Sequence, residues 1–214
     1  MPQPARTMAP PADAEPPRIG EHTALDFLNS VLAPAGETLD FLHDGASLVR
    51  WLVGSGVLPD TAAAAAAKAH TPRQLDQLAA QARELREWFR VLVQRGAAGG
   101  ERTLRKADIE HLNALMATHP LTQVIVRGPA GLELRVQRDL AQPRALLAEL
   151  AAACANLLAH QSHAAVHKCE NPPCTLLFVD NKRGPQRRWC SMAMCGNRMK
   201  AAAHRARLQQ QRLQ

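Results

Sequence analysis

Four cysteines near the C-terminus form the clearest chemical pattern in the 214-residue sequence. They make two pairs, Cys169 with Cys174 and Cys190 with Cys195, with four residues inside each pair and fifteen between the pairs. Two short loops of this kind can bring four sulfur ligands around one metal ion, and four thiolates complete the tetrahedral shell that zinc favours. The spacing therefore predicts one structural zinc ion, in a site with no open position for a catalytic water.

Two disulfide bonds, or four clustered thiols without a metal, are the alternatives for these cysteines. Disulfides persist mainly in exported proteins, and no apolar run typical of a signal peptide follows Met1. The sequence therefore favours zinc and a cytoplasmic location. The fifth cysteine, Cys154, lies in the apolar run LLAELAAACANLLA and is interpreted as a small buried hydrophobic residue.

The C-terminal segment also holds the excess positive charge of the chain. Ten of the 26 Lys and Arg residues lie from Lys168 onward, together with only two of the 19 acidic residues, Glu170 and Asp180. The remainder of the chain has sixteen basic residues against seventeen acidic ones, so the net charge of +7 comes entirely from this segment. Such segregation is typical of a surface that binds a polyanion.

A helix capped by Ser191 is expected to carry Cys195 and to continue to about residue 210. In the alternative, Gly196 belongs to the second cysteine loop and Asn197 is the N-cap. The basic residues of this helix form two stripes on nearly opposite sides: Arg198, Arg205 and Arg212 on one, and Lys200 and Arg207 on the other. A helix charged on two sides cannot bury either side against the protein, so it should project into solvent.

Double-stranded DNA is the expected partner of this helix, because the major groove admits an α-helix and its phosphates attract cations. The candidate DNA-contacting residues are Arg187, Arg188, Arg198, Lys200, Arg205 and Arg207. RNA binding is one alternative, although the finger offers only Phe178 and Trp189 for base stacking, and Trp189 is expected to pack beside the zinc. A protein-interaction module without direct DNA contact is the other alternative.

Two segments resemble known families. Residues 190–200, CSMAMCGNRMK, preceded by RRW at 187–189 and LLFVD at 176–180, resemble the CGNR zinc finger, which is named for the four residues 195–198. Residues 24–30, ALDFLNS, resemble the opening motif of the ABATE domain. One departure is the sequence NKRGPQ at 181–186, where the family usually has hydroxyl-bearing residues.

The resemblance implies a zinc-dependent, DNA-binding transcription regulator of the stress-induced kind. Its N-terminal domain is then expected to sense a small-molecule effector or to mediate homodimerisation. Within the ALDFLNS motif, Asp26 and Asn29 are interpreted as residues that form hydrogen bonds inside the fold, and a role facing a ligand is the alternative.

The fold class expected is mainly α with one β-hairpin for residues 19–167, followed by a small treble-clef-like zinc finger of hairpin and helix at 168–214. Residues 1–18 contain six prolines and no periodicity, which predicts a disordered leader. Apolar periodicity predicts a helix that begins at residue 21 and includes Val31 and Leu32. The other helices are expected at 46–53, 60–69, 72–95, 105–117 and 143–160, the hairpin strands at 123–127 and 132–137, and the finger strands at 176–179 and 187–189.

Two further groups of residues have weaker chemical interpretations. His160, His163 and His167 would share one face of a continuing helix and could bind a second metal, although histidines near a helix end are ordinary. Glu84 and Glu87 lie among Arg83, Arg86 and Arg90, which favours a salt-bridged solvent face. No nucleophile elbow, phosphate-binding loop or His-Glu-x-x-His motif occurs, so no enzymatic activity is expected. No apolar segment is long enough for a membrane span, and no membrane partner is expected.

Overall fold

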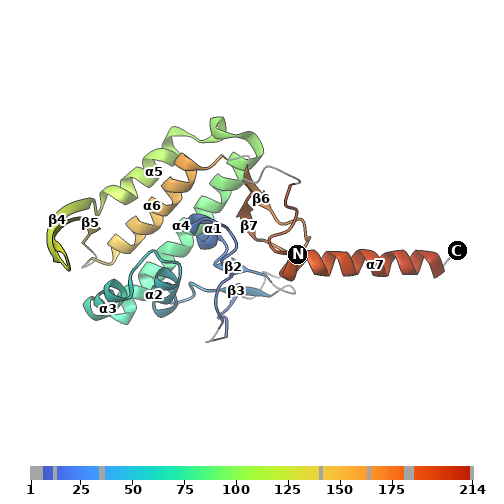
Figure 1. Ribbon diagram of the computed structural model, residues 1–214, viewed down its shortest axis with the longest axis horizontal. Coiled ribbons are helices and arrows are strands. Elements are labelled where there is room, and N and C mark those ends of the chain that lie inside the picture. Colours follow the sequence, from blue (N-terminus) through green and yellow to red (C-terminus); the bar gives the residue numbers. More distant parts are fainter. Residues whose placement is uncertain are drawn as a thin grey trace.

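The computed structural model describes residues 7–11, 14–33, 37–139, 142–162, 165–180 and 186–212 (Figure 1). The helices are α1 (Thr23–Leu28), α2 (Gly45–Gly54), α3 (Asp60–Ala69), α4 (Pro72–Gly99), α5 (Lys106–Ala117), α6 (Arg144–His160) and α7 (Asn197–Arg212), with short helical turns η2 (Glu101–Thr103) and η4 (Met192–Gly196). The strands are β1 (Thr7–Met8), β2 (Val31–Leu32), β3 (Thr38–Asp40), β4 (Leu121–Gly128), β5 (Gly131–Arg138), β6 (Val166–Lys168) and β7 (Leu177–Val179). We call residues 23–160 the helical body and residues 166–212 the finger.

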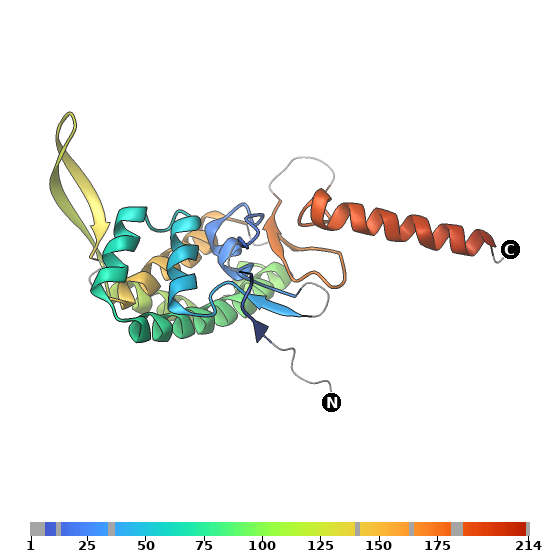
Figure 2. The ribbon, with the colours of Figure 1, turned by 90° about the horizontal axis from the view of Figure 1, so that it is seen from below.

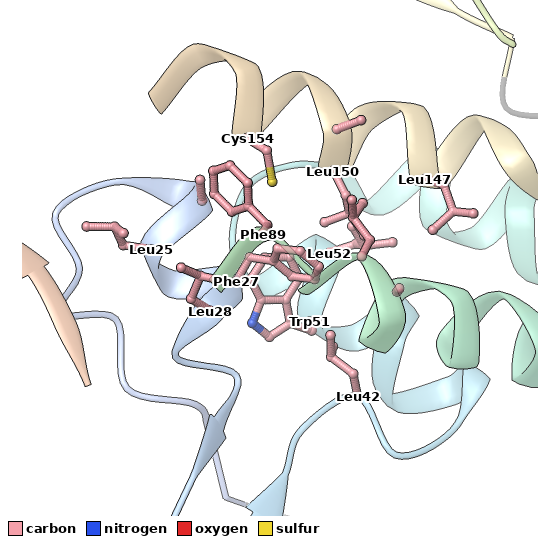
Figure 3. Close-up of a cluster of buried hydrophobic side chains, with 14 of the residues drawn as sticks. Leu25, Phe27, Leu28, Leu42, Trp51, Leu52, Phe89, Leu147, Leu150 and Cys154 are labelled. Atoms are coloured by element: carbon pink, nitrogen blue, oxygen red, sulfur yellow. The ribbon is translucent and has the colours of Figure 1, made fainter. Parts of the chain in front are cut away.

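The core of the helical body lies where α1, α2, α4 and α6 meet (Figure 3). Phe27 of α1 contacts Trp51 of α2, with ring centroids 5.7 Å apart, and Phe89 of α4 is fully buried beside them. Cys154 of α6 is also fully buried, and this burial raises the pKa of its thiol. The interpretation of Cys154 as a small hydrophobic residue is therefore confirmed, as is the mainly helical character of this part of the chain.

The long helix α4 begins and ends where its sequence dictates. Thr71 caps it and forms a reciprocal pair of hydrogen bonds with Gln74, and Pro72 occupies the first turn, where its missing N–H is not needed. The helix ends at Gly99 and is capped by Gly100, whose φ of 74° a residue with a Cβ would adopt only with strain. It therefore extends four residues beyond the predicted end at residue 95.

One arginine of α4 points into the protein, contrary to the expected solvent face. The Arg86 guanidinium is 3% exposed and donates two hydrogen bonds of 2.8 Å to the Asp40 carboxylate, and a third of 3.0 Å to the Ser30 hydroxyl. Glu87, by contrast, is half exposed and pairs with both Arg86 and Arg90, as predicted. Charge spacing indicated the exposed pairs but not the buried one, because Asp40 lies far away in sequence.

Two expectations for the N-terminal part of the chain were wrong. Helix α1 ends at Leu28, and Val31–Leu32 forms a strand antiparallel to β3 instead of continuing the helix. The tertiary hydrogen bonds of Asn29 and Ser30 outweigh the helical periodicity here. Part of the expected disordered leader is ordered, because Thr7–Met8 pairs in parallel with Thr38–Leu39. These strands form a small sheet in the order β1-β3-β2.

The predicted hairpin is confirmed as β4 and β5, paired from Leu121↔Arg138 to Gly128↔Gly131. Its turn is Pro129 and Ala130, followed by Gly131 with a φ of 135°. The finger also contains a hairpin, but not the expected one. Strand β7 pairs with Val166–Lys168, whereas the Arg188 carbonyl accepts a hydrogen bond of 2.9 Å from the N–H of Glu170, which is not part of β7.

Candidate metal centre and basic helix

The four cysteines predicted to bind zinc lie together in the finger. One sulfur atom from each of Cys169, Cys174, Cys190 and Cys195 lies within 4.8 Å of the other three. The Cys174 and Cys190 sulfurs are 3.9 Å apart, and the Cys190 and Cys195 sulfurs are 3.5 Å apart. Zn–S bonds of about 2.3 Å in a tetrahedron place sulfurs roughly 3.8 Å apart, so the donor set fits one zinc ion.

Backbone hydrogen bonds shape the two loops that hold these sulfurs. In the first loop, the N–H of Cys174 bonds to the Asn171 carbonyl at 2.8 Å, and the N–H of Cys169 bonds to the Leu176 carbonyl at 3.0 Å. In the second loop, the N–H groups of Cys195 and Gly196 both bond to the Ser191 carbonyl at 3.0 Å. These hydrogen bonds fold each loop tightly, so that the two thiols of each pair point toward the same position.

The thiols interact strongly with one another. A hydrogen bond from the Cys190 thiol lowers the pKa of Cys174 to about 5, and the same bond raises the pKa of Cys190. Burial raises the pKa of Cys169. Four thiolates would repel one another in this small space, and a divalent cation removes that repulsion. Bound zinc would supply structural cross-linking only, because four protein ligands close its shell.

Asn171 is a member of the site that the sequence analysis missed. Its side chain is 8% exposed and donates a hydrogen bond to the Cys195 sulfur at 3.3 Å. Hydrogen bonds of this kind orient a ligand and stabilise its thiolate form. The signal in the sequence is a polar amide between two cysteines of one pair.

Strand β7 belongs to two cores at once. Leu177 and Val179 pack into the core of the helical body, whereas Leu176 and Phe178 pack with the cysteines. Successive side chains of a strand point to opposite faces, so one short strand serves both sides. The metal centre is therefore built directly onto the helical body.

The ALDFLNS motif makes the polar part of this connection. The Asn29 amide donates to the Leu177 carbonyl at 2.8 Å and accepts from the Leu177 N–H at 2.9 Å. Asp26 accepts a hydrogen bond of 2.8 Å from the Gly20 N–H, and the Gly20 carbonyl accepts one of 3.0 Å from Val179. The expectation that Asp26 and Asn29 bond within the fold is confirmed, and Asn29 does so across the boundary between body and finger.

Helix α7 starts at the metal centre and projects away from the rest of the protein (Figures 1 and 2). The Ser191 hydroxyl accepts a hydrogen bond of 3.2 Å from the Met194 N–H, which identifies Ser191 as the cap of η4. Every residue from 200 to 211 is exposed. The projection predicted from the two basic stripes is therefore confirmed.

The six candidate DNA-contacting residues divide into two groups. Arg198, Lys200, Arg205 and Arg207 are exposed on α7, and no ion pair links them to another described residue. Arg187 instead binds within the protein: it pairs with Glu21, donates 2.9 Å to the Trp189 carbonyl, and lies 4.3 Å from the Phe178 ring centroid.

Arg188 also has partners within the finger. Its Nε lies 2.6 Å from the Glu170 carboxylate, and its guanidinium lies 5.0 Å from the Trp189 ring centroid. Trp189 itself packs against the cysteine cluster, as expected. Because Arg188 is well exposed, with 61% of its side chain accessible, it could exchange this ion pair for a phosphate more easily than Arg187 could.

His160 and His167, two of the three histidines considered for a second metal site, do not share a helical face. Helix α6 ends at His160, whose ring bonds to the Asn156 carbonyl, and His167 lies in strand β6 against Phe178. His163 lies outside the described residues. Among the described residues, the four cysteines are the only cluster of potential metal ligands found.

The fold and this site together define a zinc-finger protein with a helical N-terminal domain. A family model described as "ABATE: Putative stress-induced transcription regulator" matches residues 21–161, and a model described as "CGNR zinc finger" matches residues 166–208. The first match spans well over half of the chain, so the chain belongs to the ABATE family and carries a CGNR zinc finger. A comparison with curated proteins found no significant match. The resemblance seen in residues 24–30 and 190–200 is confirmed, and so is the expectation of one zinc ion.

Neither family description is that of an enzyme. In the part of the chain that the structure describes, no helix is both long and apolar enough to cross a membrane.

Proposed function

We propose that this protein is a zinc-dependent transcription regulator that acts in the cytoplasm and binds double-stranded DNA through α7. The observation that carries the proposal is a projecting helix, exposed from residue 200 to residue 211, with basic residues on opposite sides. An α-helix fits the major groove, and phosphates line both walls of that groove. Arg198 and Arg205 would face one wall, while Lys200 and Arg207 would face the other.

The free helix is poorly stabilised, which fits a segment that is completed by a partner. Sixteen residues with no packing beyond the first turn are marginal as a helix in water. The first turn is held by the metal centre, since α7 follows directly after Cys195 and Gly196. Zinc therefore fixes the start and direction of the helix, and DNA would supply the remaining stabilisation. Arg188 is proposed as a flanking phosphate contact, and Arg187 as a weaker one.

The experiment is binding of the zinc-loaded protein to random duplex DNA over a salt series. A variant with Arg205→Ala and Arg207→Ala should bind more weakly and reduce the salt slope by about 2, because each lost phosphate contact contributes roughly 0.9. The matched control has Gln209→Ala and Gln210→Ala on the same exposed helix and should bind as the wild type does. Binding that is indifferent to both salt and the arginine variant would contradict the proposal and favour a protein partner.

The helical body is proposed as the regulatory part, which senses a small effector or mediates dimerisation. A cavity of about 510 Å³ between the N-terminal segment and α2 supports effector binding, because its volume is that of a typical small-molecule site. Trp51 and Phe41 supply apolar lining, and Arg50 and Asp26 supply charged groups. No catalytic role is proposed for this cavity.

A further inference from the structure

The hairpin of β4 and β5 is the second projecting element of the molecule, at the end opposite α7 (Figures 1 and 2). Its main contacts are those between its own two strands. An isolated two-stranded hairpin is marginally stable in water unless one face packs against something. The described structure therefore contains an element that requires a further surface.

One face of the hairpin carries its large apolar side chains. In the observed register, Ile125 lies opposite Leu134, Gln123 opposite Val136, and Arg127 opposite Leu132. Residues directly opposite each other share a face, so five apolar residues lie on the same side. All five are strongly exposed: Leu121 (57%), Ile125 (70%), Leu132 (73%), Leu134 (65%) and Val136 (59%).

The other face of the hairpin is mainly polar. It carries Thr122, Glu133, Arg135 and Gln137, with Val124 and Val126 partly buried between them. The Glu133 and Arg135 side chains form an ion pair on this face. The apolar face also carries Gln123 and, next to the turn, Arg127, but no acidic residue. Its central part, around Ile125 and Leu134, is suited to an apolar surface of similar shape.

We propose that this apolar face is a homodimerisation surface, and that its occupant is the same face of a second copy of the chain. A two-fold axis in the plane of contact places the central pair, Ile125 and Leu134, against its own copy, while Arg127 lies beside the turn, away from this centre. The five side chains expose on the order of 500 Å² of surface per copy, so two copies would bury about 1,000 Å², which is the lower limit for a specific interface.

The test is the association state of the full-length, zinc-loaded protein without DNA, measured by sedimentation equilibrium. The wild type should dimerise at micromolar concentration. A variant with Ile125→Glu and Leu134→Glu should raise the dimer dissociation constant at least about 100-fold, because charges would be buried without partners. Thr122→Glu, on the same strand but the opposite face, is the matched control and should leave the constant within a factor of about two.

The residues concerned lie far from the helical core and the metal centre, so helix content and zinc stoichiometry should be unchanged in all variants. If the glutamate variant misfolds, Ile125→Gln with Leu134→Gln provides a milder disruption with the same expected direction. A wild type that stays monomeric to about 100 µM would overturn the proposal. So would a dimer that survives both hairpin variants, or one that Thr122→Glu disrupts equally. Since no DNA is present, these outcomes are independent of whether α7 binds DNA.

Discussion

The helical body and the finger are stabilised by different means. The body buries an apolar core drawn from α1, α2, α4 and α6, with large side chains such as Phe27, Trp51 and Phe89. The separate cluster in the finger contains five buried residues, and three of them are cysteines. Burial of so few apolar side chains is not enough to stabilise a module of this size without a metal ion. The comparison indicates that zinc decides the structure of the finger and contributes less to that of the body.

Loss of zinc should have the largest effect and should separate the two regions. Structural zinc contributes on the order of 10 kcal/mol to the folding of a small finger. After chelation, or with Cys190→Ser, residues 166–180 and 186–196 should lose protection in hydrogen exchange, while α2 and α4 keep theirs. Cys154→Ala is the control, because this cysteine lies in the helical core and should leave one zinc per chain. Simultaneous loss of protection in α4 and the finger would refute the separation.

The converse experiment destabilises the helical body by removing its buried ion pair. Asp40→Ala removes the buried carboxylate and leaves the buried Arg86 guanidinium with only the half-exposed Glu87 as an ion-pair partner, which should reduce the free energy of unfolding by about 3–5 kcal/mol. Glu87→Ala removes the half-exposed partner of the same guanidinium and should cost less than about 1 kcal/mol. Denaturant unfolding of the zinc-loaded protein measures both values. Equal effects of the two substitutions would contradict the burial argument.

The same ion pair should make the stability of the body depend on pH. Burial by itself raises the pKa of Asp40, but the hydrogen bonds and charge of Arg86 outweigh it, and the pKa lies below its ordinary value. The contribution is therefore present above the unfolded-state pKa of about 3.9 and is lost as the pH falls through the lower folded-state pKa. Thermal unfolding between about pH 5 and 2 should show a smaller loss of stability in Asp40→Asn than in the wild type, and the loss that remains comes from other carboxyl groups with lowered pKa values, such as Asp108. Parallel curves for wild type and variant would show that Asp40 is not the group responsible.

A third substitution tests the connection between the two regions. Asn29→Leu removes both hydrogen bonds to Leu177 and leaves a buried N–H and carbonyl unpaired, at a cost of about 2–4 kcal/mol. The variant should also weaken the effect of zinc on the melting temperature of the body, because β7 is then held by apolar contacts alone. An unchanged zinc-dependent shift would mean that Asn29 does not couple the metal centre to the body.

The smallest effect should come from Asn171 beside the metal. Asn171→Leu removes the hydrogen bond to the Cys195 sulfur and should lower zinc affinity about 10–100-fold. Competition with a chromophoric chelator measures this affinity. The stability of the helical body should not change. Unaltered affinity would show that the amide has no role in tuning the thiolate.

Local patterns in the sequence predicted most of what is local in the structure. The spacing of the cysteines predicted the zinc ligands, and the glycines around Pro129 and Ala130 predicted the β4–β5 turn. Thr71 and Pro72 predicted the start of α4. In each case the determining residues lie within a few positions of one another, or act through a metal that requires a fixed number of ligands.

The features that the sequence did not predict depend on distant partners. Strand β7 was expected to pair with residues 187–189, but it pairs with Val166–Lys168. This pairing is favoured because Val166, Leu177 and Val179 pack into the core of the helical body. The Arg86 side chain points inward because its hydrogen-bond partners, Asp40 and Ser30, lie in distant parts of the sequence that pack against α4. The apolar alternation of β4 and β5 was visible as strand pattern, but its exposure follows only from the absence of any described element over that face.

The most direct test of the account is to measure DNA binding during a zinc titration of the metal-free protein. If zinc orders the finger and thereby fixes α7, DNA affinity should rise with the first equivalent of zinc and then stay constant. Helix content should increase when DNA is added to the zinc-loaded form, since α7 is marginal alone. DNA affinity that is the same with and without zinc would contradict the central claim that the metal centre positions the DNA-binding helix.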